Sequence, residues 1–507
     1  MAQSLGGQVK KGYLWTLLGT GIGQPFSFVV GVVLARLLSP ADFGVIASCL
    51  IFTEMASTIV SSGFVSALIQ RKEVTPLHLS TALVLQLCTG MVMAGLLITT
   101  SPLVAWLIGS DLVGPVLFVL AFNLIPLAVS STPSTIARRN LDFRLLSLVN
   151  LMNLLVYGSV AIVLAFFEFG VWGLVIGRVV SRLVELVQLS VATQWCPSMR
   201  FSRVVAVSLM HMAFQFIWKN ILNDLTKKVD YLIVSWNLGV ESLGFYSRAS
   251  YLMTVPIDKL STSLGTVLFP AFSKIQDDSA QLIRGLLKAT ALIAMTTFPF
   301  LFGLLLTGPD LVAIVYGEKW LPTALPLQIL CLAGLFYAVD APAVSLIDAA
   351  GYLTDEIRRQ CIYLAVLVVC VLFGLSWGLA GVASGVVVAA MVYWCFLVGL
   401  LNRRIGVTWS NYLWSLFPAI LGGMVMVLVV RGFQWMVNPF WGPHSVWILI
   451  GTIFLGGLSY FSTLFAIRSF VSQPILVEAF GEAEIMIRKI CNQILKAITR
   501  GVQWQRL

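Results

Sequence analysis

Charged side chains inside apolar stretches are the residues whose types and spacing point most directly to chemistry in this sequence. The stretch 211–236 contains Lys219, Asn223 and Lys227 at intervals of four residues, which places them on one face of a helix. A charge at the centre of a bilayer costs roughly 2.5–3.5 kcal/mol on insertion scales, so such residues normally face protein or water and mark a pathway. Lysines outnumber aspartates in this stretch. The surplus predicts a hydrated, cationic cleft that accepts an anionic substrate.

The same charges could instead satisfy one another within each helix. Asp224 with Lys228, and Arg182 with Glu185, have the spacing of helical neighbours and could pair. For Arg182 with Glu185 this reading stays open, whereas in 211–236 pairing would still leave a surplus cation. The next apolar stretch, 244–268, adds two further basic residues. We therefore predict that the cationic cleft binds its substrate through Lys219, Asn223, Lys227, Lys228, Arg248 and Lys259.

Two acidic residues lie deep in other apolar stretches without a basic neighbour on the same helix. Glu54 and Asp340 are candidates for coupling to H⁺, to Na⁺ or to the membrane potential, and hydrogen bonds to a neighbouring helix would explain them equally well. The sequence contains no nucleophile triad, P-loop or HExxH motif, and its 8 cysteines form no ligand cluster. We predict no enzymatic activity, no catalytic residue, no metal and no cofactor.

The elements that position these residues are predicted to be transmembrane helices. Of the 507 residues, 59% are apolar and 11% are charged, and the mean hydropathy is +0.94, which excludes an ordinary soluble domain. Apolar stretches of about 20 residues predict about fourteen transmembrane helices. Most Lys and Arg residues fall in alternate connections, which fits the positive-inside rule with both termini in the cytoplasm. The net charge of +10 therefore requires no nucleic-acid partner.

An internal repeat organises these helices. GLLITTSPLVAWLIG (Gly95–Gly109) returns as GLLLTGPDLVAIVYG (Gly303–Gly317), and FGVWGLVIGRVV (Phe169–Val180) returns as WGLAGVASGVVV (Trp377–Val388). Near the start of each copy, LARLLSPADFG (Leu34–Gly44) corresponds to VSWNLGVESLG. The repeat predicts two parallel six-helix lobes around a pseudo-twofold axis along the membrane normal, as in alternating-access transporters.

The repeat also predicts how the chain divides. An N-terminal six-helix lobe covers 1–200 and a C-terminal six-helix lobe covers 201–405. An additional pair of transmembrane helices, 406–470, lies outside the duplication. The remaining segment, 471–507, alternates apolar and basic residues, which is typical of an amphipathic helix on the cytoplasmic membrane surface.

Three segments of the sequence also resemble a known family. VLARLLSPADFGVIA, LFPAFSKIQDD (Leu268–Asp278) and VYGEKW (Val315–Trp320) are similar to the polysaccharide-transporter (Wzx-type) branch of the multidrug/oligosaccharidyl-lipid/polysaccharide (MOP) flippase superfamily. Within that branch the likeness is to the WzxC-type colanic acid exporters, and it extends along essentially the whole chain. The resemblance implies an all-α polytopic membrane protein whose two lobes enclose a cationic cavity.

The resemblance further implies a lipid-linked oligosaccharide flippase of the bacterial inner membrane. Such proteins move undecaprenyl-diphosphate-linked repeat units from the cytoplasmic to the periplasmic leaflet, for exopolysaccharide or O-antigen biosynthesis. Membrane lipids, and the polymerase and glycosyltransferases of the same pathway, are the implied partners. Two alternatives remain. A MATE-type cation-coupled multidrug antiporter resembles chains with an acid in the first helix, which is absent here, and a membrane polysaccharide polymerase needs larger loops than the sequence provides.

Overall fold

The computed structural model describes residues 5–276, 278–441, 445–468 and 481, and every regular element in these ranges is a helix. The chain divides into two compact units, an N-terminal unit (Met1–Ser247) and a C-terminal unit (Arg248–Leu507). Almost all of the predicted amphipathic tail, 471–507, lies outside the described residues.

Ten helices of the described residues are long and apolar enough to cross a membrane. Two of these, Arg203–Asp258 and Asp355–Ile405, run for 56 and 51 residues, well beyond the ~20 residues that one crossing requires. The chain is therefore a multi-pass, all-helical membrane protein, as predicted. The count of about fourteen crossings and the cytoplasmic position of both termini stay predictions.

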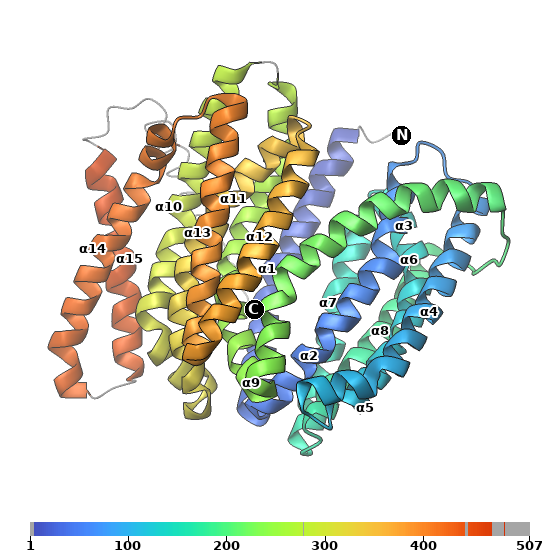
Figure 1. Cartoon of the computed structure of the whole chain (residues 1–507), viewed down its shortest axis with the longest axis horizontal. Helices are drawn as coiled ribbons and strands as arrows, with labels where there is room; N and C mark the ends of the chain where they lie inside the picture. Colours follow the sequence, from blue (N-terminus) through green and yellow to red (C-terminus); the bar gives the residue numbers. More distant parts are fainter. Residues whose placement is uncertain (1–4, 277, 442–444, 469–480, 482–507) are drawn as a thin grey trace, which may run out of the picture. The chain divides into compact units, whose positions relative to one another are not determined.

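The N-terminal unit is a bundle of helices joined by short connections (Figure 1). In chain order these are α1 (Leu5–Leu37), α2 (Pro40–Ser57), a π-helical turn (Thr58–Ser62), α3 (Gly63–Gln70), α4 (Pro76–Ile108), α5 (Val113–Ala121), α6 (Leu124–Arg139), α7 (Phe143–Phe166), α8 (Val171–Thr193) and the first part of α9 (Arg203–Lys274).

Local sequence fixes the start of α2, the helix that carries Glu54. The hydroxyl of Ser39 accepts the backbone N–H of Asp42 at 3.2 Å, and the Asp42 carboxylate accepts the backbone N–H of Ser39 at 2.9 Å. Pro40 follows at the first helical position, where its missing N–H costs nothing. The helix then continues through the π-helical turn into α3. Such turns are frequent at functional sites.

Two glycines let α2 and α9 approach closely at one end of the N-terminal unit. α9 breaks at Gly239, whose φ is 82°. Beyond the break, a Cβ atom on Gly244 would overlap the carbonyl oxygen of Pro40, and a Cβ atom on Gly44 would overlap the carbonyl oxygen of Val240. Gly44 and Gly244 occupy corresponding positions in the sequence repeat. This close approach therefore joins two glycines from corresponding positions of the sequence repeat.

We expect Gly44→Ala to lower the free energy of unfolding by about 1–3 kcal/mol, because the added methyl group meets backbone rather than a movable side chain. Thermal unfolding of the purified protein in detergent measures this change. Gly95→Ala is the matched control, since nothing lies within 4 Å of a Cβ atom there. Equal shifts in both variants would contradict the close approach at Gly44.

The C-terminal unit contains the remaining helices. They are the second part of α9, α10 (Ser279–Leu311), a π-helical turn (Val312–Tyr316), a 3₁₀ turn (Glu318–Thr323), α11 (Ala324–Ala349), α12 (Leu353–Gly374), a 3₁₀ turn (Leu375–Trp377), α13 (Gly378–Ile405), α14 (Trp409–Trp441) and α15 (Val446–Arg468). α14 and α15, the predicted additional pair, pack on each other and on α10 (Figure 1). The Tyr460 hydroxyl of α15 donates to the carbonyl oxygen of Met295 at 3.2 Å.

Backbone geometry repeats between the units at corresponding points of the sequence. Gly170 precedes α8 with φ 56° and ψ −136°, and Gly378 begins α13 with φ 63° and ψ −148°. This conformation favours glycine, so both copies keep one. The boundary between the compact units falls after Ser247 because the first part of α9 packs along α2. The division by the repeat, at residues 200, 405 and 470, stays a prediction.

Candidate functional site

A row of polar contacts joins α2 and the following π-helical turn to the first part of α9, within the N-terminal unit. Glu54 Oε2 lies 3.0 Å from Lys228 Nζ. The Thr58 hydroxyl donates to the Asp224 carboxylate at 2.5 Å, and the Asn220 amide donates to the Ser62 hydroxyl at 3.2 Å. Partners advance by four residues in opposite directions along the two helices, so they form one continuous row. We call this row the polar seam; its members are Glu54, Thr58, Ser62, Asn220, Asp224 and Lys228.

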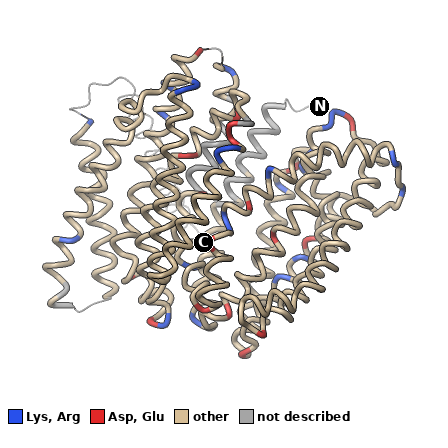
Figure 2. The backbone as a smooth tube through the Cα atoms, in the orientation of Figure 1, with Lys and Arg blue, Asp and Glu red and all other residues tan. Residues whose placement is uncertain are grey.

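The ion pair of the polar seam lies at membrane depth and is accessible. Glu54 is near the middle of the apolar span Pro40–Gln70. Its side chain is 47% exposed and that of Lys228 is 29% exposed. Charged residues also occur well inside other helices of the N-terminal unit (Figure 2). Charges at this depth are normally stabilised by protein partners or water, and here each member of the ion pair has the other as a partner.

The seam corrects two sequence-based interpretations. Asp224 and Lys228 do not pair within α9, because each finds a partner on the preceding α2 segment. Glu54 has no basic neighbour on its own helix, but it is not isolated, since Lys228 reaches it from α9. The pairing that the sequence left open in α8 is present, since Arg182 Nη1 lies 2.8 Å from Glu185 Oε2.

The other candidate residues of α9 lie beside the seam. Lys219, Asn223 and Lys227 each precede a seam residue by one position, which rotates them by about 100° around the helix. Lys227 is exposed, and the other two are half-buried. Lys227 therefore adds an exposed ammonium group on the face of α9 next to the face that carries Lys228.

The last two candidate cations belong to the C-terminal unit. The Arg248 guanidinium carbon lies 5.7 Å from the centre of the Tyr251 ring. The side chain of Lys259 lies outside the described part of the structure. Binding of substrate by any of the candidate residues stays a prediction.

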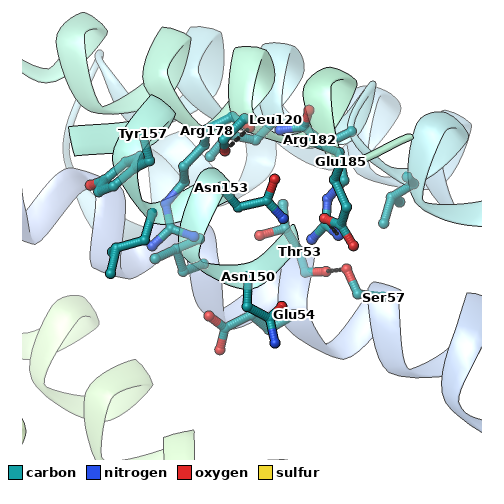
Figure 3. A pocket seen from close by; sticks show the side chains of 15 residues that line it. Thr53, Glu54, Ser57, Leu120, Asn150, Asn153, Tyr157, Arg178, Arg182 and Glu185 are labelled. Carbon is teal, nitrogen blue, oxygen red and sulfur yellow. Dashed lines mark hydrogen bonds and ion pairs between the residues drawn. The ribbon is translucent and has the colours of Figure 1, made fainter. Parts of the chain in front are cut away.

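A pocket of about 370 Å³ adjoins the seam within the N-terminal unit (Figure 3). Its walls come from α2, the α5–α6 junction, α7 and α8. Glu54 lines this pocket and also belongs to the polar seam, so the two features share a side chain. We call it the α2/α7/α8 pocket. Its polar lining consists of Thr53, Glu54, Ser57, Asn123, Asn150, Asn153, Tyr157, Arg178, Ser181, Arg182 and Glu185.

Hydrogen-bonding capacity in the α2/α7/α8 pocket is left unused. Arg178 places its guanidinium carbon 5.7 Å from the centre of the Tyr157 ring. Its Nε atom is buried and has no hydrogen-bond partner among the described residues, and the same holds for Oδ1 of Asn153. Such groups carry a free-energy penalty of about 1–3 kcal/mol each unless a ligand or water satisfies them.

The sequence patterns predict neither a site at the charges of α8 nor any contribution of α7 side chains to one. Asn150, Asn153 and Tyr157 follow one another at intervals of three and four residues, which places them on one helical face. A polar face within an otherwise apolar helix was the available signal.

Asp340 belongs to a separate buried cluster in the C-terminal unit. Glu356 and Arg359 of α12 pair with each other, and their side chains are only 2% and 4% exposed. The Arg359 guanidinium carbon also lies 4.1 Å from the centre of the Tyr393 ring. Asp340 of α11 is 8% exposed and lies within electrostatic reach of both members of the pair. Arg359 therefore lies near two buried carboxyl groups but forms its ion pair with Glu356.

Sequence comparison relates the chain to proteins of polysaccharide assembly. The family described as polysaccharide biosynthesis protein matches residues 33–325. The lipopolysaccharide biosynthesis protein WzxC of Escherichia coli (strain K12) is 24% identical over 432 residues, which cover 83% of this chain and 88% of that protein. The succinoglycan biosynthesis transport protein ExoT of Rhizobium meliloti (strain 1021) is 25% identical over 463 residues, covering 88% and 90%.

Structural comparison shows the fold. The lipid II flippase MurJ, in an inward closed conformation, superimposes with a TM-score of 0.75 at 16% identity, covering 90% of this chain and 99% of that chain. A multidrug resistance MATE family transporter of the MOP superfamily, inward-facing, gives a TM-score of 0.59 at 14% identity, covering 78% and 95%. The predicted fold class, an all-α polytopic protein of the MOP type, is confirmed.

Proposed function

This chain belongs to the polysaccharide biosynthesis protein family, and we propose that it is a flippase that moves a lipid-linked oligosaccharide across the membrane by alternating access. Relatives named for lipopolysaccharide biosynthesis and for succinoglycan transport support this function. The observation that carries the proposal is an accessible ammonium group at mid-membrane, that of Lys228 in the polar seam. We infer that this cation contacts the anionic head group of the substrate.

The proposed substrate is an undecaprenyl-diphosphate-linked repeat unit. Its diphosphate is anionic and a strong hydrogen-bond acceptor, so it competes with the Glu54 carboxylate for the ammonium group of Lys228. Lys227 offers a second ammonium from the adjacent face of α9, and Lys219 and Asn223 extend that face toward one end of the helix. Arg248 and Lys259 complete the proposed set of substrate-binding residues.

The fold does not distinguish the two transport classes, because a MATE transporter shares it. Charge distinguishes them. A drug antiporter binds organic cations, whereas the exposed Lys227 and the half-exposed Lys228 would repel them. The names of the relatives point in the same direction, toward envelope polysaccharide rather than drugs.

We place the protein in the bacterial inner membrane, with both termini in the cytoplasm and transport directed to the periplasmic leaflet. It moves its substrate without changing it chemically. The enzymes that build and polymerise the repeat unit, glycosyltransferases and a polymerase, act before and after it. Deletion of the gene tests this placement. Cells without it are expected to retain the lipid-linked repeat unit in the cytoplasmic leaflet, and unchanged export would contradict the proposal.

We expect Glu54→Gln and Asp340→Asn to weaken the dependence of transport on a pH gradient, because each carboxylate is a candidate proton acceptor. Asp340 shares its surroundings with Glu356, Arg359, Tyr393 and Tyr412, and one arginine does not neutralise both acids. Flipping in proteoliposomes, measured with and without a pH difference, checks the expectation. Unchanged rates and an unchanged pH response in both variants would leave the two residues as structural hydrogen-bonding groups.

A further inference from the structure

We propose that the α2/α7/α8 pocket binds a sugar of the transported glycan, as a neutral, hydroxyl-rich subsite beside the polar seam. This inference rests on the proposed function, because it assigns the pocket to one part of the same substrate. Its starting point is the lining of the pocket, where amides, hydroxyls and charged groups lie together (Figure 3).

Charge balance selects a neutral ligand. The pocket contains two guanidinium groups, on Arg178 and Arg182, and two carboxylates, on Glu54 and Glu185. Arg182 and Glu185 pair at 2.8 Å, and a diphosphate that takes Lys228 from Glu54 leaves the Glu54 carboxylate to balance Arg178. An anion would meet two carboxylates in this space, and a cation would meet two arginines. A ligand without charge avoids both penalties.

Hydrogen-bonding capacity selects a ligand rich in hydroxyl groups. The amides of Asn123, Asn150 and Asn153 each provide donors and an acceptor. Arg178 Nε is an unused donor and Asn153 Oδ1 is an unused acceptor. A hydroxyl group both donates and accepts, so adjacent hydroxyls of one sugar ring match this mixture. An apolar ligand would leave these groups unsatisfied.

Size and position agree with one part of a larger substrate. A volume of about 370 Å³ falls at the lower end of the ~300–1,000 Å³ range of small-molecule sites. The pocket meets the seam at Glu54, whose carboxylate is 3.0 Å from Lys228. A head group with its diphosphate at Lys228 therefore has its attached sugar next to the pocket. Leu50, Leu120 and Leu154 supply apolar surface for the ring carbons.

Equilibrium binding to the purified full-length protein tests the inference with two probes. One is undecaprenyl diphosphate without sugar, and the other is the undecaprenyl-diphosphate-linked repeat unit extracted from the source cells. We expect the wild type to bind the sugar-bearing lipid at least about tenfold more tightly, the equivalent of one or two hydrogen bonds. Asn153→Leu replaces the amide of the pocket by an apolar group and should remove most of this difference. Its affinity for the sugar-free lipid should stay that of the wild type.

Controls keep the test specific. Asn411→Leu makes the same chemical change at an exposed position of α14 and should leave both affinities unchanged. If Asn153→Leu does not fold, Asn153→Ala removes the amide without adding bulk. Equal binding of both lipids by the wild type, or full sugar preference in a folded Asn153 variant, would overturn the sugar subsite and leave the proposed function intact. Failure of the wild type to bind either lipid would contradict the proposed function, and the subsite with it.

Discussion

Replacing Lys228 with alanine is expected to lower export by about 10- to 100-fold, the value of one hydrogen bond to a charged group. The ammonium of Lys228 is the accessible cation of the polar seam, and the proposed diphosphate has to replace Glu54 as its partner. Export in cells, normalised to the amount of protein in the membrane, measures the effect. Lys228→Arg keeps the charge and should retain much of the activity.

A double variant separates substrate binding from the internal ion pair. If Lys228 served only to neutralise Glu54, removing both side chains would restore export, because no unpaired carboxylate remains. We expect Glu54→Ala/Lys228→Ala to stay as inactive as Lys228→Ala. Lys274→Ala, which removes an exposed lysine at the end of α9, is the matched control and should be active. Wild-type export by the double variant would refute a direct role for Lys228.

Replacing Arg359 with glutamine is expected to lower the free energy of unfolding by about 3–5 kcal/mol, the cost of breaking a buried ion pair. Arg359 and Glu356 are almost completely buried, and Asp340 lies close to both. Without the guanidinium, two carboxylates remain buried without a counter-charge. Thermal unfolding of the purified protein in detergent measures the loss.

Two further variants test the origin of that loss. Glu356→Gln/Arg359→Gln removes one carboxylate together with the arginine and should recover much of the stability. Arg404→Gln breaks the ion pair between Arg404 and Asp355, in which Arg404 is 50% exposed. Because exposed pairs contribute about 0–1 kcal/mol, this control should change stability little. Similar losses from Arg359→Gln and Arg404→Gln would show that burial of the Glu356–Arg359 pair is not what matters.

Much of the fold could be predicted from the sequence because the apolar length of each segment is a local property. The helical class, the multi-pass topology and the repeat all follow from patterns along the chain, and Gly170 and Gly378 keep the same conformation in both copies. Sequence periodicity also placed Lys219, Asn223 and Lys227 on one face of α9.

The partners of individual charges could not be predicted, because contacts between helices leave no periodic signal within either helix. Lys228 has Asp224 as a neighbour on its own helix but pairs with Glu54, 174 positions earlier in the chain. The register of α2 against α9 depends on the close approach at Gly44 and Gly244, which is a property of packing. The pocket formed in part by Asn150 and Asn153 of α7 also depends on contacts between helices, so no sequence motif predicted it.

The most direct test of the account is a leaflet assay with the purified protein in proteoliposomes that contain an undecaprenyl-diphosphate-linked oligosaccharide. A glycan-cleaving enzyme added outside the vesicles reports the fraction of the glycan that is exposed in the outer leaflet. We expect the wild type to bring glycan from the inner leaflet into reach of the enzyme, and Lys228→Ala in equal amount to do so about 10- to 100-fold more slowly. Exposure no faster than in protein-free vesicles, or equal rates for the wild type and Lys228→Ala, would contradict it.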